Sequence, residues 1–287
     1  MFNVRVKRFR DVEQVQFFKQ PIRENFDDRK CDPFTGEILG VGQLVREPFT
    51  NELAIIKNPA DPEQNMLRSM RRTIGKVYDI ARSNDWDWFF TLTFNPEKVN
   101  SFDYSETSKR LTAWLNNMRK KNPDMIYLVV PEQHKSGRWH FHGLFANVDN
   151  LNFLDSGKRD KKGRTIFNVG DYRLGWSTAT VITDLDRACS YVTKYLTKEL
   201  CSITSGRKRY WVSQNVKYPE IETYFVGMSE KEILELAKDK TYVKQIANAH
   251  TDIVYIDAPI HSVDTSVFIQ NSLKYLGDFE HDGTTSI

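Results

Sequence analysis

The sequence predicts an α+β fold in which helices back a largely antiparallel sheet. Between residues 63 and 200, segments with helical periodicity alternate with segments rich in β-branched and aromatic residues. Their order is helix, strand, helix, then three strands in succession and a last helix, and successive strands joined by short turns pair antiparallel. We therefore expect this region to form one antiparallel sheet with helices packed against it.

Length and composition are those of an ordinary soluble protein. The 287 residues are enough for one substantial core with accessory segments, or for two small domains. No apolar run approaches the roughly 18 residues of a membrane span, and the start of the chain lacks the apolar stretch of a signal peptide. We expect a cytoplasmic protein with no membrane partner.

The cysteines do not indicate a disulfide framework or a zinc site. Cys31, Cys189 and Cys201 are odd in number and far apart in the sequence. Disulfide-rich domains and zinc sites both need paired or closely spaced cysteines, which this chain lacks. We interpret all three as reduced thiols without a role in chemistry.

Charge is distributed unevenly along the chain and divides it into three parts. The net charge of +3 is the sum of −7 over residues 219–287 and +10 over residues 1–218. A basic body indicates a polyanionic partner, whereas an acidic segment is more often solvated or docks a partner. We expect an accessory segment at 1–62 without an assignable fold, a catalytic domain at 63–218 and an acidic C-terminal segment.

The first predicted elements are a basic helix, a buried strand and a second helix. Residues 63–83 carry apolar side chains at helical spacing, and arginines and lysines occupy much of the remaining surface. Residues 88–94 are β-branched or aromatic and end at Asn95 and Pro96, which is typical of a buried strand. The second helix is expected over 104–121, with an apolar face formed by Leu111, Trp114, Leu115 and Met118.

A β-hairpin is expected next. Residues 126–130 form a short continuous apolar run, as in a central strand that is covered on both faces. Residues 135–137 contain a turn signal, and residues 139–145 form the return strand. The two strands should therefore be neighbours in the sheet.

The last predicted elements are a loop, a strand and a helix. Residues 149–170 are polar and include the basic stretch 158–164, so that we expect a loop there. Residues 176–182 alternate like a strand. Thr183 or Asp184 can cap a helix that runs to about residue 200.

Two histidines on the return strand are candidate metal ligands. Side chains alternate along a strand, so His140 and His142 point to one face, and Trp139, Phe141 and Phe145 point to the other. The apolar face can pack on helices, which leaves the histidines on an open side. The same pattern also fits a half-exposed polar face without a metal.

The hairpin register adds a candidate third ligand. With the turn centred on Ser136, Glu132 lies opposite His140, and opposite residues share a face with Cβ atoms about 5 Å apart. Two imidazoles and one carboxylate leave coordination positions for a phosphate oxygen, which suits Mn²⁺ or Mg²⁺. A bulge in the turn would shift this register by one residue, and His134 is a further candidate on the same face.

Two tyrosines on the last helix are candidate nucleophiles. On a helix from 185 to 200, the side chains of Tyr191, Lys194, Tyr195 and Lys198 fall within an arc of roughly 100° beside the apolar stripe. A tyrosine hydroxyl can attack phosphorus when a metal polarises the scissile phosphate and lysines stabilise the developing charge. Tyrosines at this spacing also occur as simple packing residues.

Three motifs in order resemble the HUH endonucleases. They are the strand Phe89 to Phe94, the string His140-Phe141-His142 and the segment Tyr191 to Lys198. The closest resemblance is to the two-tyrosine rolling-circle replication initiators of plasmids and small single-stranded DNA phages. The similarity covers residues 86–198, which is less than half of the chain.

The resemblance implies a ferredoxin-like core with the histidine strand in the middle of an antiparallel sheet. It also implies that His140, His142 and Glu132 hold Mg²⁺ or Mn²⁺, that Tyr191 and Tyr195 are nucleophiles, and that Lys194 and Lys198 contact phosphate. A member of this family nicks one strand of single-stranded or extruded origin DNA through a 5′-phosphotyrosine link and later rejoins it. A bacterial host cytoplasm, and a host helicase and polymerase as partners, are further expectations.

Alternatives with the same chemistry are a two-tyrosine transposase and a relaxase. The chain has no phosphate loop of the Gly-x-x-x-x-Gly-Lys-Ser/Thr type, which disfavours the large relaxases that carry their own helicase. An alternative from another class is an origin-binding protein that never cuts. The histidine pair and the tyrosines disfavour it, because binding alone requires neither.

Overall fold

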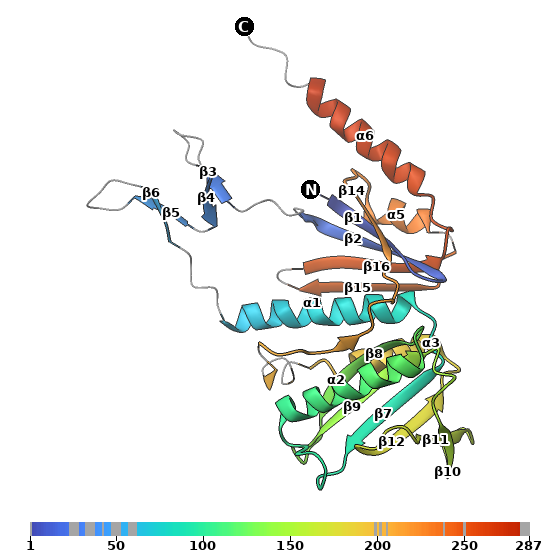
Figure 1. Ribbon diagram of the computed structural model, residues 1–287. Coiled ribbons are helices and arrows are strands. Elements are labelled where there is room, and N and C mark those ends of the chain that lie inside the picture. Colours follow the sequence, from blue (N-terminus) through green and yellow to red (C-terminus); the bar gives the residue numbers. More distant parts are fainter. Residues whose placement is uncertain are drawn as a thin grey trace. The chain divides into compact units, whose positions relative to one another are not determined.

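The computed structural model divides the chain into two compact units, which are treated separately below (Figure 1). Unit 2 comprises Glu63–Pro219, and unit 1 combines Met1–Pro62 with Glu220–Ile287. None of the helices among the described residues is long and apolar enough to cross a membrane. The residues that the structure describes are 2–22, 29–31, 38–41, 43–46, 53–56, 62–197, 200, 203–204, 206–237, 239–248 and 251–281.

Unit 2 is built on an antiparallel sheet, and the predicted α+β fold is confirmed. The sheet has seven strands in the order β10-β11-β12-β7-β9-β8-β13. The predicted hairpin register is also confirmed, because Glu132 pairs with His140 across β8 and β9. The strands are β7 Trp88–Phe94, β8 Ile126–Gln133, β9 Trp139–Ala146, β10 Phe153–Arg159, β11 Thr165–Val169, β12 Gly175–Val181 and β13 Trp211–Val212.

The four central strands have a ferredoxin-like arrangement. Their order is β12-β7-β9-β8, and helix α2 (Tyr104–Lys121) makes the crossover between β7 and β8. The hairpin β10-β11 stands where a ferredoxin-like fold has its second helix, and helix α3 (Leu185–Thr193) follows the last central strand instead. This topology places β9, the histidine strand, between two neighbours in the middle of the sheet.

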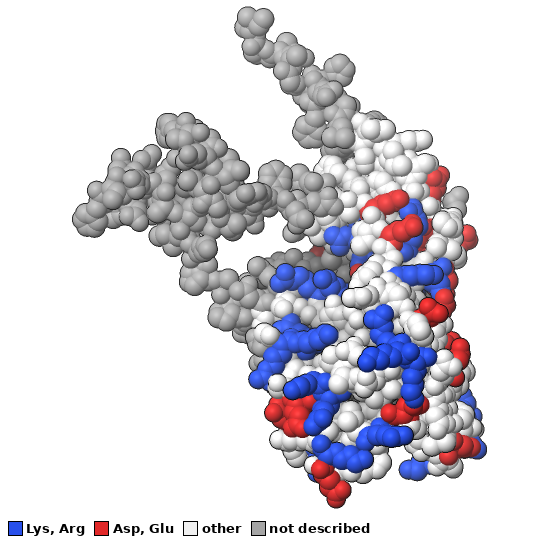
Figure 2. All heavy atoms as spheres, in the orientation of Figure 1, with Lys and Arg blue, Asp and Glu red and all other residues white. Residues whose placement is uncertain are grey.

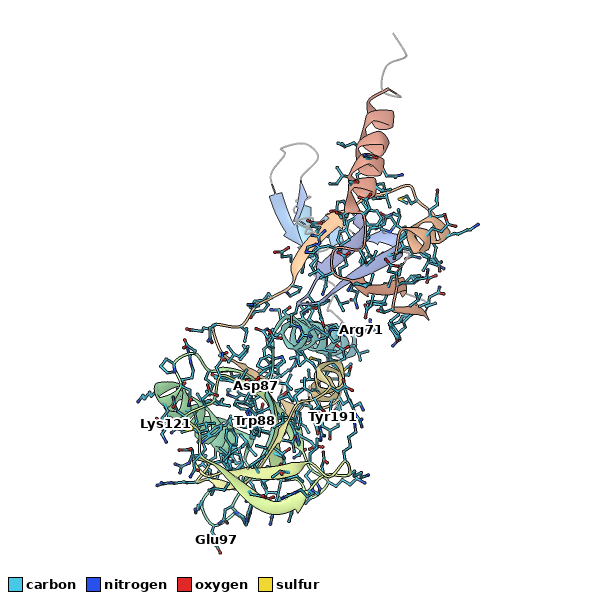
Figure 3. All side chains as sticks on the ribbon, turned by 90° about the vertical axis from the view of Figure 1, so that its right-hand side faces the viewer. Arg71, Asp87, Trp88, Glu97, Lys121 and Tyr191 are labelled. Carbon is cyan, nitrogen blue, oxygen red and sulfur yellow. The ribbon has the colours of Figure 1, made fainter. Side chains whose placement is uncertain are left out.

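Helices cover both faces of the sheet in unit 2. Helix α2 starts at Asp103, whose carboxylate accepts hydrogen bonds from the first-turn amides, and buries the apolar face that its sequence predicts. Trp114 of α2 meets the ring of Phe145 on β9 edge-on, with centroids 6.3 Å apart. Figure 3 shows α2 with Lys121 and α3 with Tyr191 on opposite sides of the sheet. Helix α1, Pro62–Ser83, adds further core residues including Val77 and Ile80.

The prediction of a loop over residues 149–170 is wrong, because most of this segment forms the hairpin β10-β11. Two aromatic residues in the polar stretch account for the difference. Phe153 stacks on Trp88 with centroids 4.2 Å apart, and Phe167 meets the same indole edge-on at 5.6 Å. Burial of these rings against β7 stabilises strands that the composition of the segment does not reveal.

The prediction that α3 continues to about residue 200 is also wrong. The helix ends at Thr193, and the amide of the C-cap residue Lys194 bonds to the carbonyl of Tyr191, three residues back rather than the four of an α-helix. The Thr193 hydroxyl donates to the Ser190 carbonyl, which competes with the regular backbone ladder. Tyr195 therefore lies just beyond α3, in the turn that follows it.

Unit 1 joins the two ends of the chain in one antiparallel sheet. Strand β14 pairs with β1, and β16 pairs with β2, in the order β14-β1-β2-β16-β15. The sequence leaves the N-terminal segment without a fold and treats the acidic segment separately, whereas the structure shows strands of both in one sheet. The strands and helices are β1 Phe2–Arg8, β2 Val12–Ile22, β14 Glu220–Tyr224, β15 Tyr242–Asn248, β16 Thr251–Pro259, α5 Glu230–Leu236 and α6 Thr265–His281.

Unit 1 has its own apolar core. Val4 and Val6 of β1, Ile256 of β16 and Phe268 of α6 are fully buried in one cluster that is separate from the core of unit 2. Two further short hairpins lie in the segment between β2 and α1. They consist of β3 Arg29–Cys31 with β4 Ile38–Val41, and of β5 Gln43–Arg46 with β6 Leu53–Ile56.

Candidate active site

The alternation of β9 places the two histidines on one face of the sheet and the aromatic residues on the other. Phe141 and Phe145 are completely buried on the α2 side. His142 is only 6% exposed, whereas His140, nearer the hairpin turn, is partly accessible. The open side that the sequence predicts is thus open at His140 and covered at His142.

Glu132 binds the histidine that lies diagonally across from it. Its backbone pairs with His140, but its Oε2 atom lies 2.7 Å from Nε2 of His142. This hydrogen bond is the main reason why the pKa of Glu132 is lowered, so the carboxylate stays ionised at neutral pH. Glu132, His140 and His142 therefore lie together at one end of the sheet.

Two threonines of β7 contact the histidines from the neighbouring strand. Oγ1 of Thr91 lies 3.1 Å from Nδ1 of His142, and Oγ1 of Thr93 lies 3.5 Å from Nδ1 of His140. Such contacts fix the orientation of an imidazole and direct Nε2 toward a ligand. Sequence reasoning missed these residues, although their alternation, Thr-Leu-Thr, matches that of His-Phe-His on the paired strand.

His134 lies beside His140 at the mouth of the hairpin. Their rings stack with centroids 5.3 Å apart. Burial, and then the nearby imidazole of His134, lower the pKa of His140. His140 is therefore mainly neutral at neutral pH, as a metal ligand must be.

The donor set fits a divalent cation. Within the part of the chain that the structure describes, no three His, Cys, Asp or Glu side chains are already grouped as a metal site. However, two ligand atoms at right angles around Mg²⁺ or Mn²⁺ are about 3.0 Å apart, given bonds of about 2.1 Å. The 2.7 Å between Glu132 and His142 needs to widen by only a few tenths of an ångström. His140, His142 and Glu132 can thus supply two nitrogens and a carboxylate.

Tyr195 packs directly on the buried histidine. Its ring lies parallel to that of His142, with centroids 4.0 Å apart and an interplanar angle of 4°. Burial, followed by hydrogen bonding with Tyr191 and the charge of Glu132, raises the pKa of Tyr195 well above its usual value. The hydroxyl is therefore neutral until a cation or a base assists its ionisation.

Tyr191 lies one helical turn earlier and is more accessible. It is 43% exposed, and its ring meets those of Tyr195 and Phe89 edge-on, with centroids 5.4 Å apart in both cases. Although α3 ends between the two tyrosines, they remain neighbours, because the tight turn after Thr193 continues in nearly the same direction. Both hydroxyl-bearing rings consequently lie over the histidine face of the sheet.

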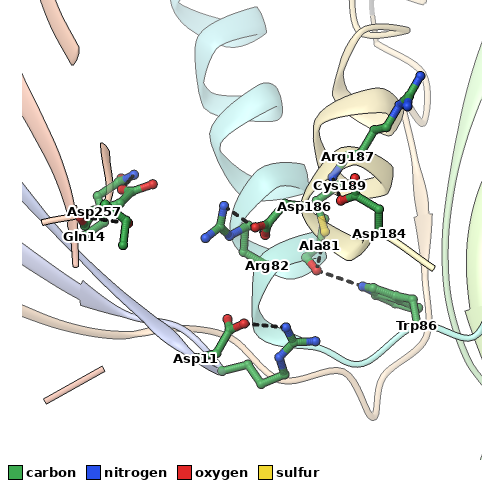
Figure 4. A network of polar contacts seen from close by, with 12 residues as sticks. Asp11, Gln14, Ala81, Arg82, Trp86, Asp184, Asp186, Arg187, Cys189 and Asp257 are labelled. Carbon is green, nitrogen blue, oxygen red and sulfur yellow. Dashed lines mark hydrogen bonds and ion pairs between the residues drawn. The ribbon is translucent and has the colours of Figure 1, made fainter. Parts of the chain in front are cut away.

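Helix α3 is held in this position by α1 (Figure 4). Cys189 contacts the carbonyl oxygen of Ala81 through its Sγ atom at 3.1 Å, and the indole of Trp86 donates to the same oxygen at 2.8 Å. Arg82 forms an ion pair with Asp186 at 3.4 Å. Cys189 is thus a buried packing residue, whereas Cys31 and Cys201 have no described side chains.

The predicted phosphate-contacting lysines differ in what the structure says of them. Lys194 is exposed, and its Nζ atom lies 5.6 Å from the centroid of the Tyr191 ring. Lys198 lies outside the described residues. Lys194 is therefore close enough to the candidate nucleophile to reach a phosphate bound there.

Other cations lie away from the histidine face. Figure 2 shows lysine and arginine side chains gathered over the part of unit 2 that contains α2, on the opposite side of the sheet. In the basic segment 158–164, Arg159 pairs with Asp155 and Arg164 with Asp160, which offsets part of its charge. The exposed lysines and arginines of α2 are Lys109, Arg110, Lys120 and Lys121.

Comparison with known proteins gives one family match. Neither curated proteins nor solved structures yielded a match to the chain. Residues 87–200, about two fifths of the chain, match the model of a family of replication-associated proteins of the ORF2 type. This stretch begins just before β7 and ends beyond α3, so it contains the histidines, Glu132 and both tyrosines. The match supports a DNA-binding initiator of rolling-circle replication.

Proposed function

We propose that this chain is a two-tyrosine initiator of the HUH type, which nicks one strand of origin DNA and later rejoins it through a 5′-phosphotyrosine. The observation that carries the proposal is the parallel stack of Tyr195 on His142, while Glu132 is bonded to the same imidazole. A nucleophile-bearing ring thus touches a candidate metal ligand. Packing alone does not require two histidines and a carboxylate at that point.

In the proposed reaction, the hydroxyl oxygen of Tyr191 or Tyr195 attacks the scissile phosphorus. A bond forms between the tyrosine oxygen and phosphorus, and the bond from phosphorus to the 3′ oxygen breaks. The tyrosine gives up its proton to solvent, and the departing 3′ oxygen takes up a proton to become a 3′ hydroxyl. Attack of a 3′ hydroxyl on the phosphotyrosine reverses these steps and reseals the strand.

Each side chain has a distinct task in this scheme. His140, His142 and Glu132 would hold Mg²⁺ or Mn²⁺, which when bound supplies a Lewis acid to polarise the phosphate. Thr91 and Thr93 orient the two imidazoles. Because burial raises the pKa of Tyr195, ionisation of its hydroxyl depends on positive charge nearby. Lys194 and, in sequence, Lys198 are the cations proposed for that charge.

Adduct formation tests this proposal. The full chain is incubated with Mn²⁺ and single-stranded oligonucleotides that tile the DNA flanking its gene, and the products are separated on a denaturing gel. We expect a slower-migrating covalent adduct that disappears with a chelator. The double variant Tyr191→Phe, Tyr195→Phe should form none yet still bind DNA, because it loses only the hydroxyls.

Tyr218→Phe provides the matched control, because Tyr218 is a similarly accessible tyrosine of unit 2, 61% exposed, that is not in the histidine cluster. This variant should form adduct at the normal rate. DNA binding without any adduct would instead favour the origin-binding protein that never cuts. Residual adduct in the double variant would show that another residue is the nucleophile.

A further inference from the structure

We infer that Trp176 is a stacking site for an unpaired nucleobase next to the nick, an inference that rests on the proposed function and adds a substrate subsite to it. Trp176 is 60% exposed on β12, in the interior of the seven-stranded sheet rather than at its edge. Of the other tryptophans, Trp86, Trp114, Trp139 and Trp211 are buried, and Trp88 stacks on Phe153. Trp176 alone among the six presents most of its surface to solvent.

The sheet register puts Trp176 in one row with the candidate metal ligands. Trp176 pairs with Thr93, Thr93 pairs with His140, and His140 pairs with Glu132, so all four side chains share one face. Two strand spacings separate Trp176 from His140, which corresponds to about 10 Å. A base next to a phosphate bound at His140 can reach that far.

The surface between Trp176 and the histidines consists of small hydroxyl side chains. Thr93 separates the indole from His140, and in the adjacent row Thr178 and Thr91 separate β12 from His142. Threonines are short, and their hydroxyls can bond to phosphate and sugar oxygens. A single strand lying across them would therefore meet polar groups along its backbone and an aromatic face at its end.

Close contact between strands fixes the position of Trp176. A Cβ atom on Gly175 would lie 2.1 Å from the carbonyl oxygen of Thr93 and 2.5 Å from the amide nitrogen of Asn95. Glycine at this position lets the backbones of β12 and β7 approach each other directly before Trp176. The indole is thus set on a rigid strand, as a stacking platform requires.

Single-stranded DNA is the partner that this surface fits best. Aromatic rings bind unpaired bases by stacking, which tolerates sequence because every base has a π-face, while polar and cationic groups hold the backbone. The proposed nicking reaction needs an unpaired strand at the histidines, and Trp176 is in their row. The structure therefore assigns the indole to a base, and the threonines to the sugar and phosphate beside it.

Binding of defined strands to the full chain tests this inference. The probe is a fluorescent oligo(dT) of about 15 nucleotides, within the site size of single-strand binders, and the comparison strand is an abasic oligomer of equal length. A chelator is present, so cleavage contributes nothing to the signal. Trp176→Ala should weaken oligo(dT) binding by about fivefold or more, the loss expected for one stacked base, and leave binding of the abasic strand unchanged.

Two further variants separate stacking from folding. Trp176→Phe retains a ring and should keep most of the affinity, and Tyr218→Ala, which removes an equally exposed ring elsewhere in unit 2, should bind normally. Failure of the wild-type chain to bind oligo(dT), unchanged binding by Trp176→Ala, or an equal loss for the abasic strand would overturn the inference.

This outcome is independent of the nicking test. If adducts form but Trp176→Ala binds normally, the stacking site is wrong and the nicking reaction stands. If no adduct forms but Trp176→Ala loses base-dependent binding, the reaction is wrong and the stacking site stands.

Discussion

His142 illustrates how a single residue in this chain is prepared for chemistry. Its Nδ1 atom faces the hydroxyl of Thr91, its Nε2 atom faces Glu132, and its ring stacks on Tyr195. These contacts come from two neighbouring strands and the turn after α3, so that the ring has little freedom to rotate. Pre-organisation of this kind reduces the entropy cost of binding a metal or a phosphate at the site.

At the same scale, two glycines should respond in opposite ways to alanine. Gly175→Ala places a Cβ atom 2.1 Å from the Thr93 carbonyl, so the paired backbones must separate, and we expect a loss of about 3 kcal/mol in the unfolding free energy. Gly75→Ala meets nothing within 4 Å on α1 and should stabilise the chain by about 0.5–1 kcal/mol.

Chemical denaturation followed by tryptophan fluorescence measures both changes. If Gly175→Ala unfolded at the same denaturant concentration as the wild type, the close approach of β7 and β12 described here would be incorrect. Since Gly175 precedes Trp176, the same variant should also weaken oligo(dT) binding in conditions where it remains folded.

Among the elements, α3 is short and depends on its ends. Asp184 caps it by accepting a hydrogen bond from the Arg187 amide at 3.0 Å, and the tight turn at Lys194 terminates it. The helix has only nine residues, too few to be stable in isolation, so packing on α1 and the sheet stabilises it. The placement of both tyrosines depends on these contacts.

Removal of this cap should therefore destabilise the tyrosine element. Asp184→Ala is expected to lower the unfolding free energy of unit 2 by about 1 kcal/mol, whereas Asp184→Asn should cost less because its side-chain oxygen can still accept the bond. Hydrogen exchange of the α3 amides reports the change locally. Asp149→Ala, at another exposed aspartate outside a helix, is the control and should have no effect on those amides.

The elements also show what the sequence could predict. Strand β7, helix α2 and the hairpin register were predictable, because apolar periodicity and turn residues determine them locally. The hairpin β10-β11 was missed because its stability comes from Trp88, far away in sequence. The threonines behind the histidines and the exposed Trp176 were missed for the same reason, since strand pairing gives them their neighbours.

At the scale of the whole molecule, the chain carries two cores with different sequence ranges. Unit 2 folds from a continuous stretch, whereas unit 1 needs both ends of the chain. The sequence could not predict this closure, because contacts between β1 and β14 join residues more than 200 positions apart. The charge difference between the segments gave no indication that they pair.

This organisation predicts the effect of deleting residues 220–287. The deletion removes β14, β15 and β16, which leaves β1 and β2 as an isolated pair, and a two-stranded hairpin is marginal in water. Glu13, fully buried on β2, would also lose the amide of Val263 that bonds to it at 2.6 Å. We expect β1 and β2 to unfold while the core of unit 2 stays intact.

Hydrogen exchange measured by mass spectrometry distinguishes the two units in the truncated chain. Amides of β1 and β2 should exchange at the rate of an unfolded peptide, while those of β7, β8 and β9 keep the protection that they have in the full chain. Unfolding of the central strands of unit 2 in the truncated chain would show that its fold depends on unit 1. Retained protection, together with a retained adduct, would place the whole nicking apparatus within residues 63–219.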